Sequence, residues 1–314
     1  MNTVSQTTDT VIEVMPRDLS GYRQGNVGVD YVHRFDSGRH GPHVLINSLT
    51  HGNEFCGMTV VTHLLDSQVR PLIGKLTLSF ANVEAYQSFD PAKPFASRQI
   101  VHNMNRIWSA EQLDGSEDSP ELRRARAMRA VVQAADHVLD IHSTAQDVEP
   151  FWVYPAFERN AQVALGVGIP QIHLAMPNGL GSGTPLIQYG AFGQAHHHGA
   201  AMVVECGQHF KKSTGDVALA STLGFLAHFG LIEPPPAQPR PPAKRFELLQ
   251  TCVITSPDFR FVKPVKGFEV FAQGELIATQ GGQEIRALCD DCTILMPARE
   301  AIVGREAVYL AKPI

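Results

Sequence analysis

A histidine and a glutamate stand three residues apart in His51-Gly-Asn-Glu54, shortly after the apolar run from His43 to Ile46. Catalytic zinc sites usually take three histidine or carboxylate ligands and leave one position for water or substrate. A strand followed by a glycine-containing turn can bring both side chains toward one point. The same spacing also occurs in a polar strand-to-helix turn, so the pair predicts a metal site only together with a further ligand.

A second histidine, His142, follows a short apolar run that begins at Val138. In open α/β sheets, ligands bind outside the carboxyl ends of the strands, so two histidines at strand ends can share a crevice. Alone, such a histidine is more often an ordinary loop side chain. Together with His51 and Glu54, it completes a predicted group of three ligands for one metal ion.

A third apolar run, 201–204, leads directly into Glu205 and a glycine turn. A carboxylate in such a place is costly to bury without a partner. A metal-activated water needs a general base that takes its proton and later passes it to the leaving amine. We therefore predict that Glu205 is this base, with a structural ion pair as the alternative.

Two of the arginines between the second and third predicted ligands are candidates for substrate binding, in Ser97-Arg98 and in Asn103-Met-Asn105-Arg106. The planar guanidinium group of arginine matches a carboxylate with two parallel hydrogen bonds. The pattern predicts that Arg106, with Asn105, holds a free acid group of the substrate. Solvation at the surface is the alternative for both arginines.

The ordered motifs HGNE, NR, DIHS and VVECG resemble the aspartoacylase and succinylglutamate desuccinylase family of zinc-dependent N-acyl amino acid amidohydrolases, which are relatives of the zinc carboxypeptidases. The resemblance extends from about residue 40 to the C terminus. It implies that His51, Glu54 and His142 bind Zn²⁺ and that Glu205 is the general base. The zinc ion is the one cofactor that it implies.

The resemblance also implies roles for residues that hold the substrate. It implies that Asn105 and Arg106 bind the amino acid carboxylate and that Arg98 polarises the scissile carbonyl. Tyr309 lies in a stretch similar to the closing motif of the family, which implies a substrate-binding hydroxyl that reaches over the crevice. A strand tyrosine whose hydroxyl faces outward is the alternative.

Two positions depart from the pattern of the family. Asn103 replaces the aspartate of the usual Asp-Leu-Asn-Arg, so a carboxylate that would orient neighbouring groups is lost. Ala195 stands where aspartoacylases carry an arginine for the side-chain carboxylate of N-acetylaspartate. Without that cation an acidic side chain would be buried unpaired, so we do not expect N-acetylaspartate to be the substrate. The run His196 to His198 is predicted to face solvent.

Apolar runs alternate with helical patterns through the first 230 or so residues, which predicts an α/β sheet with helices on its faces. With the resemblance, the expected fold is a zinc carboxypeptidase-like mixed sheet flanked by helices. Strands are predicted at 43–49, 76–83, 138–141, 152–154, 172–175 and 201–204, and the clearest helices at 121–135 and about 216–229.

The expected domain order is a catalytic α/β domain at 1–232, a proline-rich linker at 233–245 and a small all-β domain at 246–314. Proline removes backbone donors and favours an extended chain, which explains the choice of linker. Short apolar runs separated by Gly, Pro and Asp predict the β domain. Placed over the active site, this domain would favour small acylated amino acids over peptides.

The composition excludes several classes of function. The 314 residues carry a net charge of -5 with no basic stripe, so nucleic acids and membrane surfaces are not expected partners. The first ten residues lack a secretory pattern and the five cysteines are odd in number, which together predict a cytoplasmic protein with reduced thiols. Cys289 and Cys292 are interpreted as ordinary cysteines of the β region.

Together these observations predict a zinc-dependent deacylase that cleaves the amide of a small N-acylated amino acid or a related carboxylate-bearing amide. A zinc carboxypeptidase acting on peptides and a non-catalytic zinc-binding scaffold are the two alternatives. The acyl group, the amine product, the pathway and any homo-oligomeric state are left open by the sequence.

Overall fold

The computed structural model describes residues 11–234, 236 and 241–314. The first ten residues, which entered the prediction of a cytoplasmic protein, lie outside the described residues, as do residues 235 and 237–240 of the predicted linker. Within the described ranges, no helix has both the length and the apolar character needed to cross a membrane.

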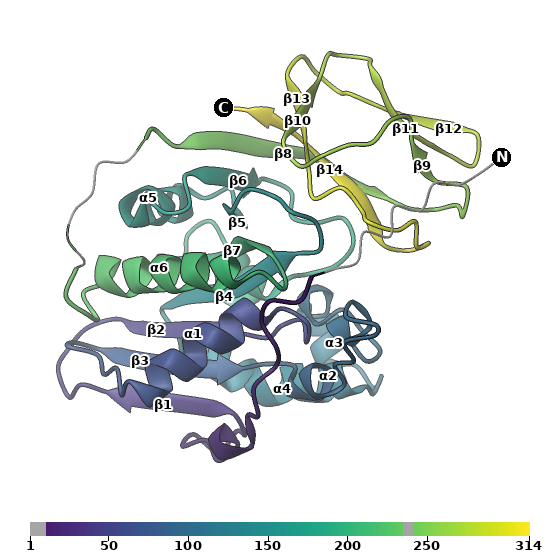
Figure 1. Cartoon of the computed structure of the whole chain (residues 1–314). Helices are drawn as coiled ribbons and strands as arrows, with labels where there is room; N and C mark the ends of the chain where they lie inside the picture. Colours follow the sequence, from purple (N-terminus) through teal and green to yellow (C-terminus); the bar gives the residue numbers. More distant parts are fainter. Residues whose placement is uncertain (1–10, 235, 237–240) are drawn as a thin grey trace.

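Eleven strands from the described part of the chain form one mixed sheet in the order β1-β3-β2-β4-β7-β5-β6-β8-β14-β13-β10 (Figure 1). Their bounds are β1 Val32–Asp36, β2 His43–Ser48, β3 Lys75–Phe80, β4 His137–Thr144, β5 Phe151–Pro155, β6 Ile172–Met176, β7 Ala201–Gln208, β8 Lys244–Val253, β10 Glu269–Phe271, β13 Cys292–Leu295 and β14 Glu306–Pro313. A second, three-stranded sheet holds β9 Arg260–Phe261, β11 Leu276–Gln280 and β12 Gln283–Arg286.

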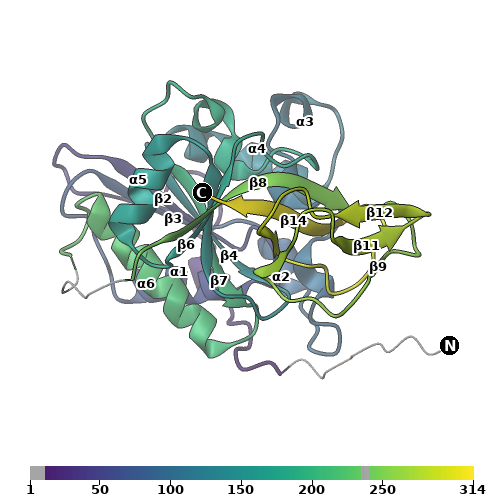
Figure 2. The same ribbon diagram turned by 90° about the horizontal axis from the view of Figure 1, so that it is seen from above.

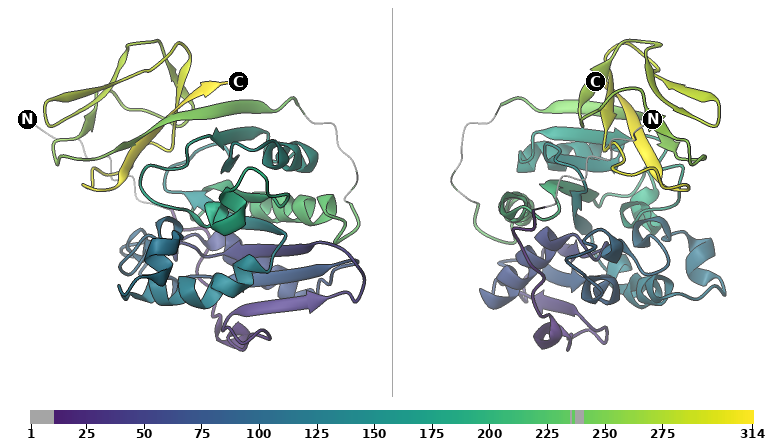
Figure 3. Two further views of the ribbon diagram at one scale, coloured as in Figure 1. Left: turned by 180° about the vertical axis from the view of Figure 1, so that it is seen from behind. Right: turned by 45° about the vertical axis from the view of Figure 1, so that its right-hand side comes forward.

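Helices cover both faces of the main sheet, as an α/β architecture requires. Their bounds are α1 Phe55–Asp66, α2 Val83–Gln87, α3 Ala110–Asp114, α4 Pro120–Gln133, α5 Glu158–Val167 and α6 Lys212–His228. One apolar core joins α1, α5 and α6 to the sheet, and a second core joins α3 and α4 to the other face. Figure 3 shows α4 on the side opposite to α6. The expected α/β fold is confirmed.

The C-terminal strands continue the main sheet. β8 pairs in parallel with β6 and antiparallel with β14, so the region after the predicted linker is joined edge to edge to the region before it. Figure 2 shows β8 and β14 running from the main sheet toward β9, β11 and β12. The expected C-terminal β strands are present, while the division of the chain at 233–245 stays a prediction.

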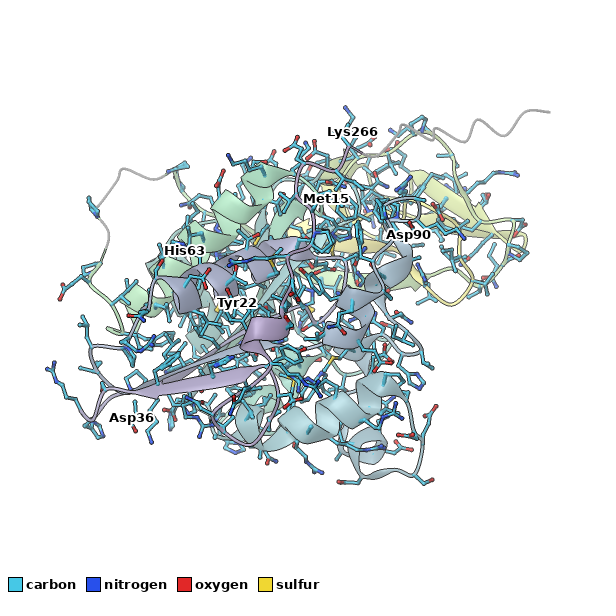
Figure 4. All side chains as sticks on the ribbon, turned by 60° about the horizontal axis from the view of Figure 1, so that its bottom comes forward. Met15, Tyr22, Asp36, His63, Asp90 and Lys266 are labelled. Atoms are coloured by element: carbon cyan, nitrogen blue, oxygen red, sulfur yellow. The ribbon has the colours of Figure 1, made fainter. Side chains whose placement is uncertain are left out.

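The N-terminal segment packs along the outer side of α1. The Tyr86 hydroxyl donates to the backbone oxygen of Arg17 at 2.6 Å, and the Tyr22 hydroxyl donates to Asp66 at 2.6 Å. In Figure 4, Met15 and Tyr22 mark this segment and His63 marks α1. These contacts join the N-terminal segment to α2, through Tyr86, and to the end of α1, through Asp66.

Two strands are longer than predicted, and this changes where the predicted site residues stand. The parallel ladder of β4 and β7 continues through the pair His142–Glu205 to Thr144–Gln208. His142 and Glu205 therefore lie within strands and not beyond their ends. The polar residues His142 and Glu205 do not end their strands, because their side chains line the pocket while the backbone stays paired.

Glycine is required in the turn between the first two predicted ligands. A Cβ atom at Gly52 would lie 2.4 Å from the backbone of Ala85, Tyr86 and Ser97, which is too close for any side chain. α1 then begins at Phe55, directly after Glu54. The turn thus packs against the backbone of α2 and of the 3₁₀ helix η2, Ala96–Arg98, and this contact fixes the relative position of both ligands.

A buried carboxylate holds the segment that carries Arg98 and Asn103. Glu121, in the first turn of α4, accepts hydrogen bonds from the backbone N–H groups of Ile100 at 2.6 Å and of Val101 and His102 at 3.2 Å each. Glu121 itself is fully buried. These bonds fix the path of residues 100–102 between the two site residues.

We expect Glu121→Gln to lower the free energy of unfolding by about 1–3 kcal/mol, because the amide replaces a charged acceptor of several buried N–H groups. Glu111→Gln is the matched control, since Glu111 stands at the same position in the first turn of α3 but is exposed. That change should stay within about 0.5 kcal/mol. Urea unfolding of the three proteins measures both, and equal effects would contradict the role of Glu121.

Candidate metal centre and substrate pocket

His51, Glu54 and His142 converge on one point, as the sequence predicts. Glu54 lies with Oε1 2.9 Å from Nδ1 of His51 and with Oε2 3.0 Å from Nδ1 of His142. One ligand atom from each residue lies within 4.8 Å of the others, and all three side chains are buried. The sheet explains the arrangement, because β2, which leads into His51 and Glu54, pairs in parallel with β4, which carries His142.

The far nitrogen of each imidazole ring is held by a hydrogen-bond acceptor. Nε2 of His51 lies 2.8 Å from Oδ1 of Asn103, and Nε2 of His142 lies 2.8 Å from Oδ2 of Asp140. The oxygen of Asn103 also accepts the backbone N–H of Asn105 at 3.0 Å, which fixes the orientation of the amide. Both rings therefore turn Nδ1 toward Glu54.

These contacts leave His51 with a bare lone pair toward Glu54. Its Nε2 must carry a proton to donate to Asn103, and a neutral ring then has none on Nδ1. Burial lowers the pKa of His51 to about 4, so the ring is neutral near pH 7. Two acceptors consequently face each other at 2.9 Å in a buried place. A bound cation resolves this contact, so the donor set fits a metal ion.

Glu54 and His142 carry the charges of the group. Burial alone would raise the pKa of Glu54, but the charge and the hydrogen bond of His142 hold it well below its usual value. Burial would likewise lower the pKa of His142, but Asp140 and Glu54 raise it well above the usual value. The carboxylates of Asp140 and Glu54 thus favour a positive charge in the space between the two imidazole rings.

Asp140 is a site residue that the sequence analysis missed. It accepts hydrogen bonds from Asn47 and Thr50 at 2.8 Å each, in addition to its contact with His142. Its signal is visible in the sequence, because residues two apart in a strand share one face. An aspartate two positions before a ligand histidine is therefore placed to orient that ring.

Arg98 lies beside the metal ligands. Its Nη1 donates to Oε1 of Glu54 at 2.9 Å, and its side chain is 28% exposed toward the pocket. The other oxygen of Glu54 accepts the backbone N–H of Ser143 at 3.0 Å. The hydroxyl of Ser143 in turn contacts Nδ1 of His209 at 2.8 Å, a pocket residue that the sequence analysis did not select.

Glu205 faces the same pocket from β7. It stands opposite His142 in the parallel ladder, and its Oε2 is buried without a hydrogen-bond partner among the described residues. Burial raises the pKa of Glu205 to about 8, and the neighbouring His142 only partly offsets this effect. A carboxyl group with an unengaged oxygen and a raised pKa is suited to accept and return a proton.

Arg106 meets Tyr309 and a second carboxylate across the pocket. Its Nη2 lies 2.8 Å from Glu306 and 3.2 Å from the Tyr309 hydroxyl, while Nε reaches Ser182 and Glu306 at 2.9 Å each. Nη1 donates to the backbone oxygen of Asn105 at 2.7 Å. These contacts use four of the five N–H bonds of the guanidinium group. One N–H therefore remains for a ligand, fewer than the two that a two-pronged contact with a carboxylate needs, and the binding of the substrate's acid group by Arg106 with Asn105 stays a prediction.

Glu306 was not selected from the sequence, although it lies within the stretch 304–310 that suggested Tyr309. Burial would raise its pKa, but Arg106 lowers it to about 2, so this buried pair is ionic. Tyr309 is buried beside it and accepts one N–H of Arg106. Its own proton is then available as a donor to a ligand.

Ala195 and the histidines after it lie away from this pocket. Ala195 is exposed, and its backbone oxygen accepts a hydrogen bond from Arg159 at 3.0 Å. The expectation that this position faces the substrate is wrong, because the segment stays at the surface. His196 and His198 are exposed, as predicted, whereas His197 is half-buried and packs edge-on against Phe192.

Residues from both ends of the chain line the pocket. The wall includes the metal ligands, Arg98, Arg106 and Glu205 from the first part of the chain, and residues from Met296 to Tyr309 from the last part. The side-chain nitrogen of Gln146 donates to the backbone oxygen of Pro297 at 2.9 Å, which ties the two parts together beside the opening. The cavity has a volume of about 230 Å³, which suits a small ligand.

The hydrogen bond between His51 and Asn103 should affect how tightly the site binds a metal ion. We expect Asn103→Ala to weaken the affinity for a divalent metal ion such as Zn²⁺ about 10–100-fold, because His51 loses the partner that orients its ring. Asn103→Asp should bind at least as tightly as the unchanged protein, since a carboxylate makes the ring more basic. Competition with a coloured chelator measures both, and equal affinities for all three proteins would contradict this role.

Comparison with known proteins agrees with this geometry. Residues 40–179 match the sequence profile of the succinylglutamate desuccinylase/aspartoacylase catalytic domain. This range contains all three residues of the metal group, together with Arg98 and Arg106. A succinylglutamate desuccinylase of Vibrio vulnificus is 23% identical over 85% of this chain and 79% of its own length. One of Idiomarina loihiensis is 25% identical over 84% and 81%, respectively.

Solved structures show the same fold. A succinylglutamate desuccinylase of Vibrio cholerae matches with a TM-score of 0.70 at 17% identity, over 91% of this chain and 86% of its own. An aspartoacylase family protein of Mesorhizobium loti matches with a TM-score of 0.62 at 19% identity, over 93% of both chains. Residues 40–179 are therefore similar to the catalytic domain of the succinylglutamate desuccinylase/aspartoacylase family, and the whole chain shares the fold of solved members of that family.

Proposed function

We propose that the protein is a zinc-dependent hydrolase of the amide bond in small N-acylated amino acids or related carboxylate-bearing amides. The observation that carries this proposal is that a set of metal ligands and a general base line the same pocket. His51, Glu54 and His142 offer two ring nitrogens and a carboxylate to one ion, and Glu205 turns an unengaged carboxyl oxygen to the same space. The similarity of residues 40–179 to the catalytic domain of deacylases supports the amide as the bond that is cleaved.

Zinc is the metal that fits the donor set best. Two histidine nitrogens and one carboxylate form a three-ligand set that catalytic zinc uses with a fourth position open. A bound Zn²⁺ supplies Lewis acidity, which polarises a carbonyl group and makes a water molecule more acidic. Asn103 and Asp140 hold the two rings for this purpose, because each accepts a proton of the far ring nitrogen.

Glu205 moves the proton in the proposed reaction. Its free oxygen accepts a proton from the attacking water, and the same carboxyl group then donates that proton to the departing amine. Burial favours the protonated carboxyl group, so Glu205 keeps the proton between these two events. The products are a free carboxylic acid and an amino acid.

Arg98 stabilises the negative charge that develops on the carbonyl oxygen. Its guanidinium group is fixed beside the metal group by its bond to Glu54, while part of the side chain faces the cavity. A donor that is already oriented needs little rearrangement during the reaction, which makes it effective in a water-poor site.

The substrate carboxylate binds opposite, where Arg106, Tyr309 and Asn105 line the pocket. Arg106 contributes one N–H and Tyr309 its hydroxyl proton, because the other Arg106 donors are taken. The side-chain oxygen of Asn105 accepts the backbone N–H of Leu186 at 3.1 Å, which leaves its amide nitrogen as the donor. Three donors from three residues thus replace the single two-pronged clamp.

We expect Glu205→Gln to retain bound zinc and to lower kcat about 10²–10⁴-fold, because the amide can neither accept nor return the proton. Glu300→Gln is the matched control, since Glu300 is an exposed carboxylate at the edge of the same pocket. It should keep nearly full activity. Metal analysis and amine release from N-acyl amino acids measure both results. A fully active Glu205→Gln protein would refute the proposed mechanism.

We expect Arg106→Lys to raise KM for an N-acyl amino acid at least about tenfold, because lysine cannot replace a guanidinium group that bonds in several directions. The matching N-acyl amino acid amide lacks the carboxylate, so its kcat/KM should change much less. Equal losses for acid and amide would show that Arg106 only supports the fold. Turnover of dipeptides at a rate comparable to acyl amino acids would instead favour the carboxypeptidase alternative.

A further inference from the structure

The pocket extends past Glu205 along a row of apolar side chains. Val203 stands two residues before Glu205 on β7, so both side chains lie on one face, roughly 7 Å apart along the strand. Val153 of β5 pairs directly with Val203, and Leu174 of β6 pairs directly with Val153. These three residues, the apolar row, run across three adjacent strands and line the cavity.

Further apolar residues cover the apolar row. The short 3₁₀ helix η4, Leu186–Gln188, packs over β5 and β7, and its Ile187 lines the cavity. Leu180 and Met296 line it from the 177–185 segment and from the C-terminal part of the chain. Ile187 is buried, and Leu180 and Met296 are half-buried. A substituent that enters this space meets hydrocarbon on both sides.

The arginines that line the pocket belong to the segments 98–106 and 299–305, and not to the three strands of the apolar row. Arg98 bonds to Glu54, and Arg106 bonds to Glu306. Arg299 lies over the ring of Phe95, with its guanidinium carbon 4.1 Å from the ring centre. Arg305 is exposed on the C-terminal segment, and it lies close enough to Arg98 for the two positive charges to repel each other. A carboxylate placed on the apolar row would lose water without gaining a cation.

We propose that the substrate of this enzyme carries an uncharged aliphatic group that lies on the apolar row. This inference rests on the proposed function and narrows it to N-acyl amino acids whose acyl chain, or whose side chain, is apolar. Burial of such a group releases water at about 25 cal/mol per Å², whereas an unpaired carboxylate there is strongly unfavourable. The chain therefore differs in expected substrate from relatives named for succinylglutamate, in which both substituents are acidic.

Two pairs of matched compounds test the proposal and show which substituent uses the apolar row. The first pair varies the acyl group and compares N-(4-methylpentanoyl)glycine with N-succinylglycine. The second pair varies the side chain and compares N-acetylleucine with N-acetylaspartate. Within each pair an isopropyl group replaces a carboxylate of similar shape. For the zinc-loaded protein we expect kcat/KM to favour the apolar member of one pair at least about tenfold.

Substitutions in the apolar row separate its role from general stability. Leu174→Ala should reduce that preference about fivefold or more, because the aliphatic group loses its contact. Ile172→Ala is the matched control, since Ile172 is buried on the same face of β6 but does not line the cavity. The ratio of two rates measured on one sample is independent of the folded fraction. Equal shifts for both variants would overturn the proposal.

Binding measurements keep this inference distinct from the proposed function. The dissociation constants of the four compounds for the Glu205→Gln protein, measured by calorimetry, should show the same preference for the apolar member of one pair. If the unchanged protein cleaves the acidic members faster in both pairs, the apolar substrate class is wrong and the hydrolase stands. If no compound is cleaved but the apolar member binds more tightly, the hydrolase is wrong and the apolar subsite stands. Tighter binding of both acidic members overturns the subsite.

Discussion

The facing lone pair of His51 and carboxylate of Glu54 are the constraint on which the rest of the site depends. Two acceptors at 2.9 Å in a buried place are unfavourable without a cation, so the fold must hold them there by other contacts. The parallel register of β2, β4 and β7 places the segments, and Gly52 allows the turn to pack against α2. Asn103 and Asp140 then fix the rings. The contacts of the fold thus offset the unfavourable free energy of bringing these ligands together before any metal binds.

A second buried charge pair, Arg106 with Glu306, couples the substrate pocket to the fold of the C-terminal strands. Arg106 precedes the middle of the chain, whereas Glu306 begins β14, so this bond joins residues 200 positions apart. Burial makes each partner costly to leave alone, which favours docking of the C-terminal strands only in one place. Because Arg106 bonds to Glu306, only one N–H of Arg106 and the hydroxyl of Tyr309 remain as donors to a substrate.

The sequence predicted the parts of the site that are written as local patterns. His51, Glu54, His142 and Glu205 each follow an apolar run, and parallel strands bring such positions together. Contacts between distant segments were not predictable in this way. Glu306 bonds to Arg106 from the other end of the chain, and Ala195, at the position of a substrate-binding arginine in aspartoacylases, is exposed away from the pocket. The strand ends at His142 and Glu205 were set too early because polarity was read as exposure. In the structure these polar residues point into the pocket from strands that stay paired.

The same face of the sheet carries the residues for the chemistry and the residues for substrate specificity. The two sets differ in how freely their residues can be substituted. Near the carboxyl end of β4, His142 and Asp140 are bonded to each other, and His142 also contacts Glu54, so a substitution there leaves a buried charge or donor unsatisfied. Two residues before Glu205 on β7, Val203 begins the apolar row. The apolar row interacts by contact area alone, and such positions tolerate changes that preserve volume. A cation introduced at Val153 or Leu174 would admit an acidic substituent without altering the metal ligands. Specificity in this fold can therefore change independently of the chemistry, because the two are carried by successive residues of the same strands.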